Sequence, residues 1–236
     1  MSDTVQYALD RLRRELHDTV EPYFWADDEL MDYIDEGQVQ FCTKGIAIRD
    51  SRTPKVCHLE YKAGQYEIPL HESIMKIRSI MRMDSNNNLY NVDMAMQETA
   101  LEMFPIRPSD YGINTVTTAS QFNSPSDRFA VLVDYDEGYL RLSSPALTDG
   151  TLLLQVERLP LDRITDCEQE LEVRREHVVG VLEYAKHRAW SKEDAETFDE
   201  RAANRAFEMF IFHADGARIE QKRRTSQPGT VKYGGL

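Results

Sequence analysis

The spacing of apolar residues changes twice along the chain, and this change constrains the fold more than any other feature. Apolar residues recur every three or four positions over 5–16 and 30–41, which is the spacing of helices with one buried face. After Arg49 the spacing changes, and over 71–92 apolar residues alternate with polar ones, which is typical of half-buried strands. Helical spacing returns from about Thr165 and is interrupted only around 187–200. The sequence therefore predicts two terminal helix pairs around a β region.

This order predicts an α+β fold. An isolated helix pair leaves its apolar stripes half exposed, so we expect the pairs at 1–50 and 164–217 to pack on each other as a four-helix bundle. Residues 51–163 then form an inserted β domain, which we expect to be antiparallel because short turns join its strands. On the second helix, Gly37 is expected to let another backbone come close, because glycine carries no side chain.

Within the β region we expect strand pieces on both sides of Gly64, a turn at Asn86–Asn88 and further turns at the DEG and TDG motifs. In the segment that begins at Met75, three methionines and one isoleucine alternate with basic residues. The predicted buried face contains Met75, Ile77, Met81 and Met83, and the predicted solvated face contains Lys76, Arg78 and Arg82. A short helix is expected over 93–104.

Two segments lack apolar periodicity. Residues 105–128 contain three prolines and are long for a loop inside a compact domain, so either an arm that reaches a neighbouring subunit or flexible filler fits them. Residues 218–236 contain five basic residues and one acid, whereas the whole chain has a formal net charge of −13. We expect a flexible basic arm at 218–236, either without function or ordered on a partner. The acidic remainder disfavours general binding to nucleic acid.

Residues 187–203, HRAWSKEDAETFDERAA, hold side chains used in nucleophilic catalysis, namely His187, Ser191, Asp194 and Glu196. We interpret them as the connection between two helices. His187 can interact with terminal carbonyls, Ser191 or Asp194 can cap a turn, and Thr197 or Asp199 can cap the last helix. No G-x-S-x-G nucleophile motif, phosphate-binding glycine loop, metal-ligand histidine spacing or CxxC pair is present. We expect no catalytic residue, cofactor or metal, and no apolar run is long enough for a membrane span.

Four stretches in this order resemble the head-to-tail adaptor (connector) proteins of tailed bacteriophages, especially short-tailed ones. They are WADDELMDYIDEG, AGQYEIPLHESIMKIRSI, DEGYLRLSSPALTDGTLLLQVERLPL and AKHRAWSKEDAETFDERAANRAFEMF, and the likeness covers roughly residues 23–212. Each stretch is only a helix start or a hairpin signal. Their succession carries the resemblance.

The resemblance implies a structural virion protein of the neck, between head and tail, that is assembled in the host cytoplasm. Such a protein forms a ring, typically of about twelve copies, below the portal protein. The ring extends the DNA channel, through which DNA passes without specific binding, and gives downstream tail proteins a platform. The C-terminal segment of these proteins commonly reaches the portal, so the implied contacts here are Arg218, Lys222, Arg223, Arg224 and Tyr233.

Contacts between copies of the ring are also predicted from charge. The acidic start of the second helix, Asp27, Asp28 and Glu29, is expected to face the basic strand residues Lys76, Arg78 and Arg82 of a neighbour. Two other functions remain open. One is a nucleic-acid-binding accessory protein that acts through the basic tail, and the other is an enzyme of a class whose motif is not recognised.

Overall fold

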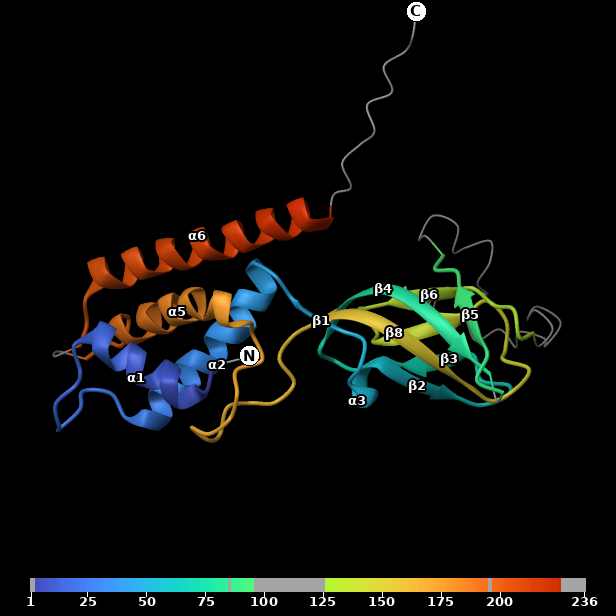
Figure 1. The fold of residues 1–236 in the computed structure, drawn as a ribbon, viewed down its shortest axis with the longest axis horizontal. Coiled ribbons are helices and arrows are strands. Elements are labelled where there is room, and N and C mark those ends of the chain that lie inside the picture. The colour runs from blue at the N-terminus through green and yellow to red at the C-terminus, as the bar shows by residue number, and fades with distance from the viewer. Residues whose placement is uncertain (1–2, 85, 96–125, 195–196, 226–236) are drawn as a thin grey trace, which may run out of the picture. The chain divides into compact units, whose positions relative to one another are not determined.

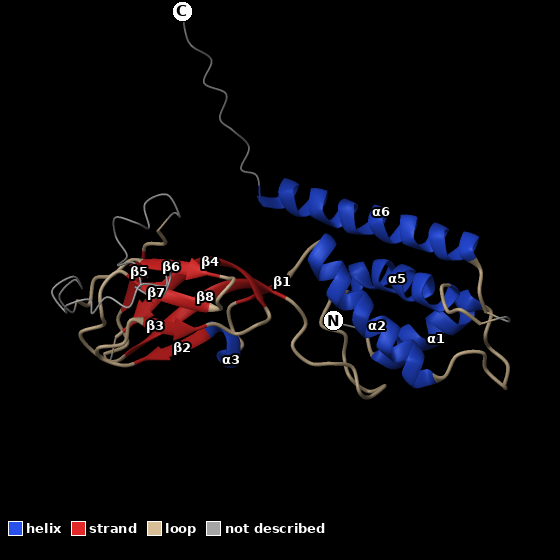
Figure 2. Cartoon of the chain, turned by 180° about the vertical axis from the view of Figure 1, so that it is seen from behind, coloured by secondary structure: helices blue, strands red, loops and turns tan. Residues whose placement is uncertain are grey.

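The computed structural model describes residues 3–84, 86–95, 126–194 and 197–225. It shows an α+β chain with antiparallel sheets, which confirms the predicted class at this level (Figures 1 and 2). The chain divides into two compact units. Residues 1–48 and 159–236 make up the helical unit, and residues 49–158 make up the β unit.

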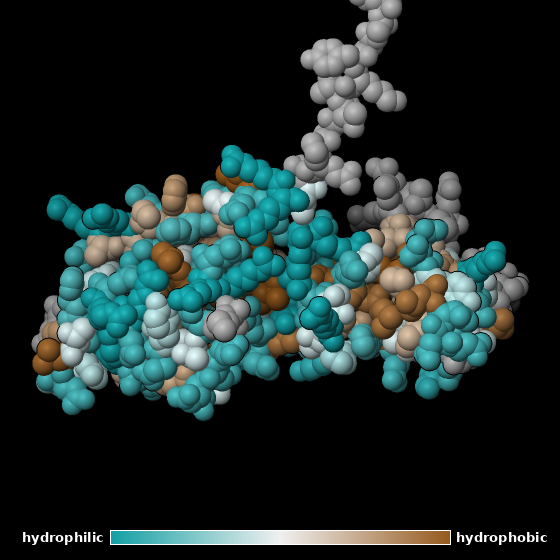
Figure 3. Space-filling model, viewed as in Figure 1, coloured by the Kyte–Doolittle hydropathy of each residue, from teal (hydrophilic) through white to brown (hydrophobic). Residues whose placement is uncertain are grey.

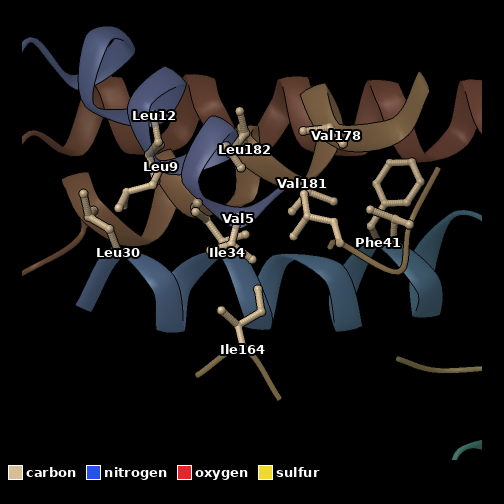
Figure 4. Close-up of a cluster of buried hydrophobic side chains, with 14 of the residues drawn as sticks. Val5, Leu9, Leu12, Leu30, Ile34, Phe41, Ile164, Val178, Val181 and Leu182 are labelled. Atoms are coloured by element: carbon tan, nitrogen blue, oxygen red, sulfur yellow. The ribbon is translucent and has the colours of Figure 1, made fainter. Parts of the chain in front are cut away.

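The helical unit contains α1 (Val5–Leu16), α2 (Asp27–Lys44), the short 3₁₀ helix η3 (Arg175–His177), α5 (Val178–Trp190) and α6 (Glu200–Thr225). α5 packs against α1, α2 and α6. All four α-helices contribute side chains to one hydrophobic core, part of which Figure 4 shows around Leu12, Ile34 and Val181. The apolar stripes predicted for α1 and α2 are buried, so segments from the two ends of the chain share one core.

Gly37 lies where α2 meets α5. A Cβ atom at this position would be 2.8 Å from the carbonyl oxygen of Val181, which is closer than atoms can approach without movement. The predicted close approach of a second backbone at Gly37 is therefore confirmed. On α5, Gly180 has a similar role, because a Cβ there would overlap the ring of Phe41.

The prediction that helix returns at about Thr165 is wrong, because residues 159–174 cross the unit without forming a helix and α5 begins at Val178. Their backbone amides are bound by side chains instead of by helical carbonyls. The side-chain oxygen of Gln169 accepts from Thr165 N at 2.6 Å, and that of the buried Gln38 accepts from Glu172 N at 2.9 Å. Such local bonds compete with the helix. Leu171 is buried as part of this segment.

The β unit contains β1 (Ile48–Asp50), α3 (Pro54–Cys57), β2 (His58–Tyr61), β3 (Glu67–Pro69), β4 (Ile74–Met83), β5 (Leu89–Val92), β6 (Val131–Asp134), β7 (Tyr139–Leu142) and β8 (Gly150–Arg158). One sheet has the order β1-β8-β4-β5 with β2 also on β8, and the other has the order β3-β7-β6. The strand pieces around Gly64 are confirmed, as are turns at Asn86–Asn88 and at Gly138 of the DEG motif. The predicted helix at 93–104 lies mostly outside the described residues.

The predicted alternation along β4 holds at Lys76, Ile77 and Arg78 and is wrong at Met75 and Arg82. The pairing of β4 with β8 shifts register between Ile74 and Lys76 and again between Ile77 and Ser79. Each irregularity changes which face the following side chains take. Ile74, Ile77, Ile80 and Arg82 are buried, whereas Met75 is exposed. Arg82, which was expected in solvent, therefore points into the unit.

The C-terminal arm was predicted to be flexible from residue 218, but α6 continues to Thr225. Ion pairs along the helix explain the extension, because Arg218 binds Asp215 and Arg224 binds Glu220, three and four positions earlier. Residues 226–236 lie outside the described part, as does most of the loop predicted at 105–128. On the buried face of α6, Ala206 and Phe210 are buried, whereas Phe207 is exposed.

Candidate docking surfaces

The catalytic-looking stretch at 187–203 connects two helices. Nδ1 of His187 lies 3.0 Å from the carbonyl oxygen of Ala203 on α6, so its ring binds the next helix and not, as expected, the end of its own. Ser191 Oγ donates to the carbonyl of His187 at 2.6 Å, and Asp199 Oδ1 accepts from the amide of Ala202 at 3.0 Å. Asp199 thus has the predicted capping position before α6. Glu196 lies outside the described residues.

Other chemical groups do not converge on a site in the described residues. No group of three or more histidine, cysteine, aspartate or glutamate side chains in this part of the chain could hold a metal ion. Burial raises the pKa of the Cys57 thiol to about 11, and the nearby Asp50 carboxylate adds to the effect. The thiol is then protonated at neutral pH and is a poor nucleophile. No helix of the described chain is long and apolar enough to cross a membrane.

The basic residues predicted to contact a portal lie on the last two turns of α6. Arg224 pairs with Glu220 and lies 3.8 Å from Glu176, while Lys222 and Arg223 are exposed. Ala217 is the last buried residue of α6, so the helix continues past the core of its own unit. Tyr233, the remaining predicted contact, is outside the described residues.

The acidic residues at the start of α2 have partners within the helical unit. Asp27 is the first residue of α2 and not its N-cap, which is Ala26, and its carboxylate binds the guanidinium of Arg13. Glu29 accepts from the Tyr33 hydroxyl at 2.7 Å and from Lys192 at 2.9 Å. Burial and the Glu29 carboxylate raise the pKa of Tyr33 to about 12. Asp28 is exposed and accepts from the amide of Glu29.

The three basic residues of β4 do not share one face. Lys76 is exposed, and Arg78 donates to the Glu157 carboxylate at 2.8 Å. Arg82 is buried, lies 3.1 Å from Asp127 and stacks over the ring of Tyr90. The pairing between the start of α2 and this strand of a neighbouring copy stays a prediction. Of its three basic residues, Lys76 and Arg78 lie at the surface.

Exposed apolar side chains form two further surfaces that the sequence reasoning missed. The loop between α1 and α2 exposes Val20 and Phe24, and α6 exposes Phe212 and Ile219 on the side away from the core. The helical unit is otherwise mainly hydrophilic on the face shown in Figure 3. The exposed apolar face of α6 could have been predicted from the sequence. Phe212 and Ile219 lie seven residues apart, on the side of the helix opposite the stripe that contains Phe210 and Ala214.

Residues 3–232 match the protein family described as SU10 adaptor protein. The chain belongs to this adaptor family. The predicted resemblance to phage head-to-tail adaptors is thereby confirmed, and the match covers nearly the whole chain, including both units. No curated protein matches the chain.

Family membership identifies the adaptor as a phage structural protein, and it implies a place in the virion neck. It also implies a non-enzymatic role in which docking surfaces are the functional parts. The surfaces described above are therefore the candidate sites of this adaptor: the basic end of α6, the acidic start of α2 and the exposed apolar side chains.

Proposed function

We propose that this adaptor forms a ring of about twelve copies beneath the portal protein, extends the DNA channel and offers the tail proteins a platform. Membership of the adaptor family over residues 3–232 carries the proposal. The chain's formal net charge of −13 supports it, because an acidic ring repels the DNA phosphates and lets the genome slide through.

In this arrangement α1, α2, α5 and α6 act as the four-helix bundle of the ring wall, and the chain from 218 onward contacts the portal. Two observations support the second part. The last turns of α6 extend beyond the buried core, and they carry the exposed Lys222 and Arg223 beside Arg218 and Arg224. A helix end of this kind can dock without disturbing its own unit. Tyr233 completes the proposed contact set.

Co-sedimentation of the full chain with the cognate portal ring tests the proposal, followed by imaging of the complex. We expect binding by the full chain and a large loss in a chain ending at residue 217, because the proposed contacts are then missing. A matched variant, Lys62→Glu in the β unit, changes one exposed lysine and should bind like the original. Failure of the full chain to bind any portal would refute the proposed function.

The basic cluster at 222–224 also favours a second candidate, an accessory role in binding nucleic acid. This binding would rest on phosphate contacts, so its affinity would fall steeply as salt rises. A gel shift with the full chain and with the chain ending at residue 217, at two salt concentrations, separates the two functions. Tight binding that depends on the tail and on low salt, without portal binding, would favour the second.

A further inference from the structure

We propose that neighbouring copies of the adaptor join head to tail through the helical unit. The α1–α2 loop (residues 17–26) of one copy packs on the outer α6 face of the next, which consists of Met209, Phe212, Gly216, Ile219 and Arg223. This inference rests on the proposed ring and names the surfaces that build it. It shares Lys222 and Arg223 with the proposed portal contact, so the tests below are chosen to separate the two contacts.

The two ends of the α1–α2 loop are fixed by buried hydrogen bonds, and the loop presents apolar side chains to solvent. Asp18 is buried, pairs with Arg13 at 2.7 Å and accepts from the amide of Phe24 at 3.0 Å. Trp25 anchors the end of the loop, because its ring is buried and its Nε1 donates to the carbonyl of Ala189. On this frame Val20 is 77% exposed and Phe24 is 54% exposed. A loop that is already ordered loses little entropy on binding, so it suits docking.

The outer α6 face has the spacing of a helix-packing seam. Its residues are separated by three, four, three and four positions, so they form one stripe along the helix. Phe212 is 69% exposed and Ile219 is 50% exposed. Between them lies Gly216, where a Cβ atom would meet nothing within 4 Å. The stripe therefore has two protruding apolar side chains, Phe212 and Ile219, with a gap between them at Gly216.

A hollow of about 200 Å³ adjoins this gap. Its lining is part apolar and part polar. The apolar part includes Phe41, Gly180, Phe212 and Ala217, and the polar part consists of Glu176, His177, His213 and Glu220. An exposed apolar side chain such as Phe24 has the chemistry to fill such a hollow, since burying it removes apolar surface from water on both partners.

Charge complementarity identifies a second copy of the chain as the occupant. Asp18 and Asp27 are bound by Arg13, so the exposed acids that the α1–α2 loop and the start of α2 offer a neighbour are Glu21 and Asp28. The last turns of α6 offer the exposed Lys222 and Arg223. An acidic apolar loop and a basic apolar helix face attract each other, and each would repel a second copy of itself. The contact is therefore between unlike surfaces, which is the kind that repeats around a ring.

The positions of the two surfaces allow this repetition. Within the helical unit, the α1–α2 loop and the last turns of α6 lie at opposite ends, as Figures 1 and 2 both show. One copy can therefore use both surfaces at once, each toward a different neighbour.

Photo-crosslinking on the full chain tests the contact, both bound to the cognate portal and free at high concentration. Phe24 is replaced by p-benzoylphenylalanine, and ¹⁵N-labelled and unlabelled copies are mixed. We expect crosslinks between copies that join position 24 to the α6 peptide containing 209–223. The same probe at Tyr139, an exposed residue of the β unit, should give no α6 crosslink. Crosslinks from position 24 only to the portal or to β4 would overturn the proposal.

Charge exchange provides a second test. The pair Glu21→Lys with Asp28→Lys and the pair Lys222→Glu with Arg223→Glu should each lower ring assembly about tenfold, and the combination of both pairs should restore most of it. Rescue distinguishes a contact between copies from a portal contact, which a change in the loop could not restore. Lys76→Glu with Arg78→Glu is the matched control and should leave assembly within about twofold. Loss of assembly in that control, without rescue in the combination, would favour the β4 pairing instead.

The proposed function and this contact can fail separately. A ring that forms free in solution with the expected crosslink, but binds no portal, refutes the proposed function and supports the contact. A portal-bound ring without the crosslink supports the proposed function and refutes the contact. A chain that stays monomeric under both conditions refutes both.

Discussion

The two units of the adaptor are assembled in different ways. The β unit comes from one continuous stretch, residues 49–158, and its strands pair mainly with strands of the same stretch. The helical unit joins residues 1–48 to residues 159–236, so more than a hundred residues separate α2 from α5, which pack together. Its core therefore forms only when the two ends of the chain meet, and loop closure makes that meeting costly.

Polar contacts hold the distant segments of the helical unit together. The side chain of Gln38 on α2 accepts from the amides of Glu172 and Val173, and Asp35 accepts from the amide of Ile164. The β unit uses a buried ion pair for a similar purpose, because Arg158 at the end of β8 binds Asp50 of β1 at 2.7 Å. In both units, polar side chains thus hold segments together that are far apart in the sequence. Each unit also contains a buried ion pair, and these pairs allow the two units to be compared.

The largest effect is expected at Arg13. Its guanidinium binds Asp18, Asp27 and the carbonyl of Trp25. Arg13→Met removes the bonds to all three partners. The buried Asp18 carboxylate then loses its counter-charge and keeps only the amides of Phe24 and Trp25 as donors, so the free energy of unfolding should fall by about 3–5 kcal/mol. The protein's two tryptophans, Trp25 and Trp190, pack edge to face in the helical unit. Urea unfolding followed by tryptophan fluorescence therefore measures this unit.

Arg158→Met is the matched change in the β unit. Asp50 keeps the hydroxyl and amide of Thr53 and the amide of Arg52 as donors, so the expected loss is smaller, about 1–3 kcal/mol. Burial disfavours the charged form of Asp50, but these hydrogen bonds and Arg158 outweigh it and lower the pKa of its carboxyl. Hydrogen exchange of the β8 amides measures the loss. Equal losses in the two units would contradict this difference.

The contrast between the units also explains how much the sequence could predict. The stripes of α1 and α2 and the close approach at Gly37 were predictable, because the period of a helix is fixed by its geometry and needs no distant information. The non-helical course of 159–174 was not, since Gln38 and Asp35 bind it from more than a hundred residues away. No local pattern contains that contact.

The candidate sites show the same limit. The basic residues Lys222 and Arg223 were identified from composition, but their helical state was not, because composition alone suggested a flexible arm. Along β4, alternation placed Arg82 in solvent, whereas two register shifts turn it inward. A β-bulge depends on the partner strand, so the spacing within one strand cannot reveal it.

A substitution at Arg82 tests this register directly. Arg82→Glu places an acid beside Asp127 in a buried position, so the β unit should lose about 2–4 kcal/mol. Lys76→Glu on the same strand changes an exposed side chain and should stay within about 0.5 kcal/mol of the original. Hydrogen exchange of the β4 amides measures both. A mild effect at Arg82 would mean that the regular alternation is right after all.

A smaller effect is expected from the glycines of the helical unit. Gly37→Ala brings a methyl group within 2.8 Å of the Val181 carbonyl, so α2 and α5 must separate slightly, at a cost of about 1–3 kcal/mol. Gly216→Ala meets no neighbour and improves helix propensity, so it should stabilise α6 by up to about 1 kcal/mol. Tryptophan fluorescence in urea measures both variants. If both variants changed the free energy of unfolding in the same direction, close packing at Gly37 would not be what determines the stability of the Gly37→Ala variant.

The smallest effect concerns pH and the helical unit alone. Burial against Phe41 lowers the pKa of His177, and the cations Arg174 and Arg224 act in the same direction, although Glu176 and Glu220 oppose them. The unfolded chain, with an ordinary histidine pKa of about 6.5, then binds the proton more strongly than the folded chain. The contribution of His177 to the free energy of unfolding is complete above pH 6.5 and is lost as the pH falls through its folded-state pKa.

His177→Phe keeps a ring against Phe41 and removes the titration, so it should flatten the change in tryptophan-detected stability just below pH 6.5. His58→Gln, at an exposed position of the β unit, should leave that change as it is. One proton limits the slope to about 1.4 kcal/mol per pH unit, which is why this effect ranks last. Since His177 lines the hollow beside α6, a flattened profile would also show that protonation of this lining residue is coupled to the folding of the helical unit.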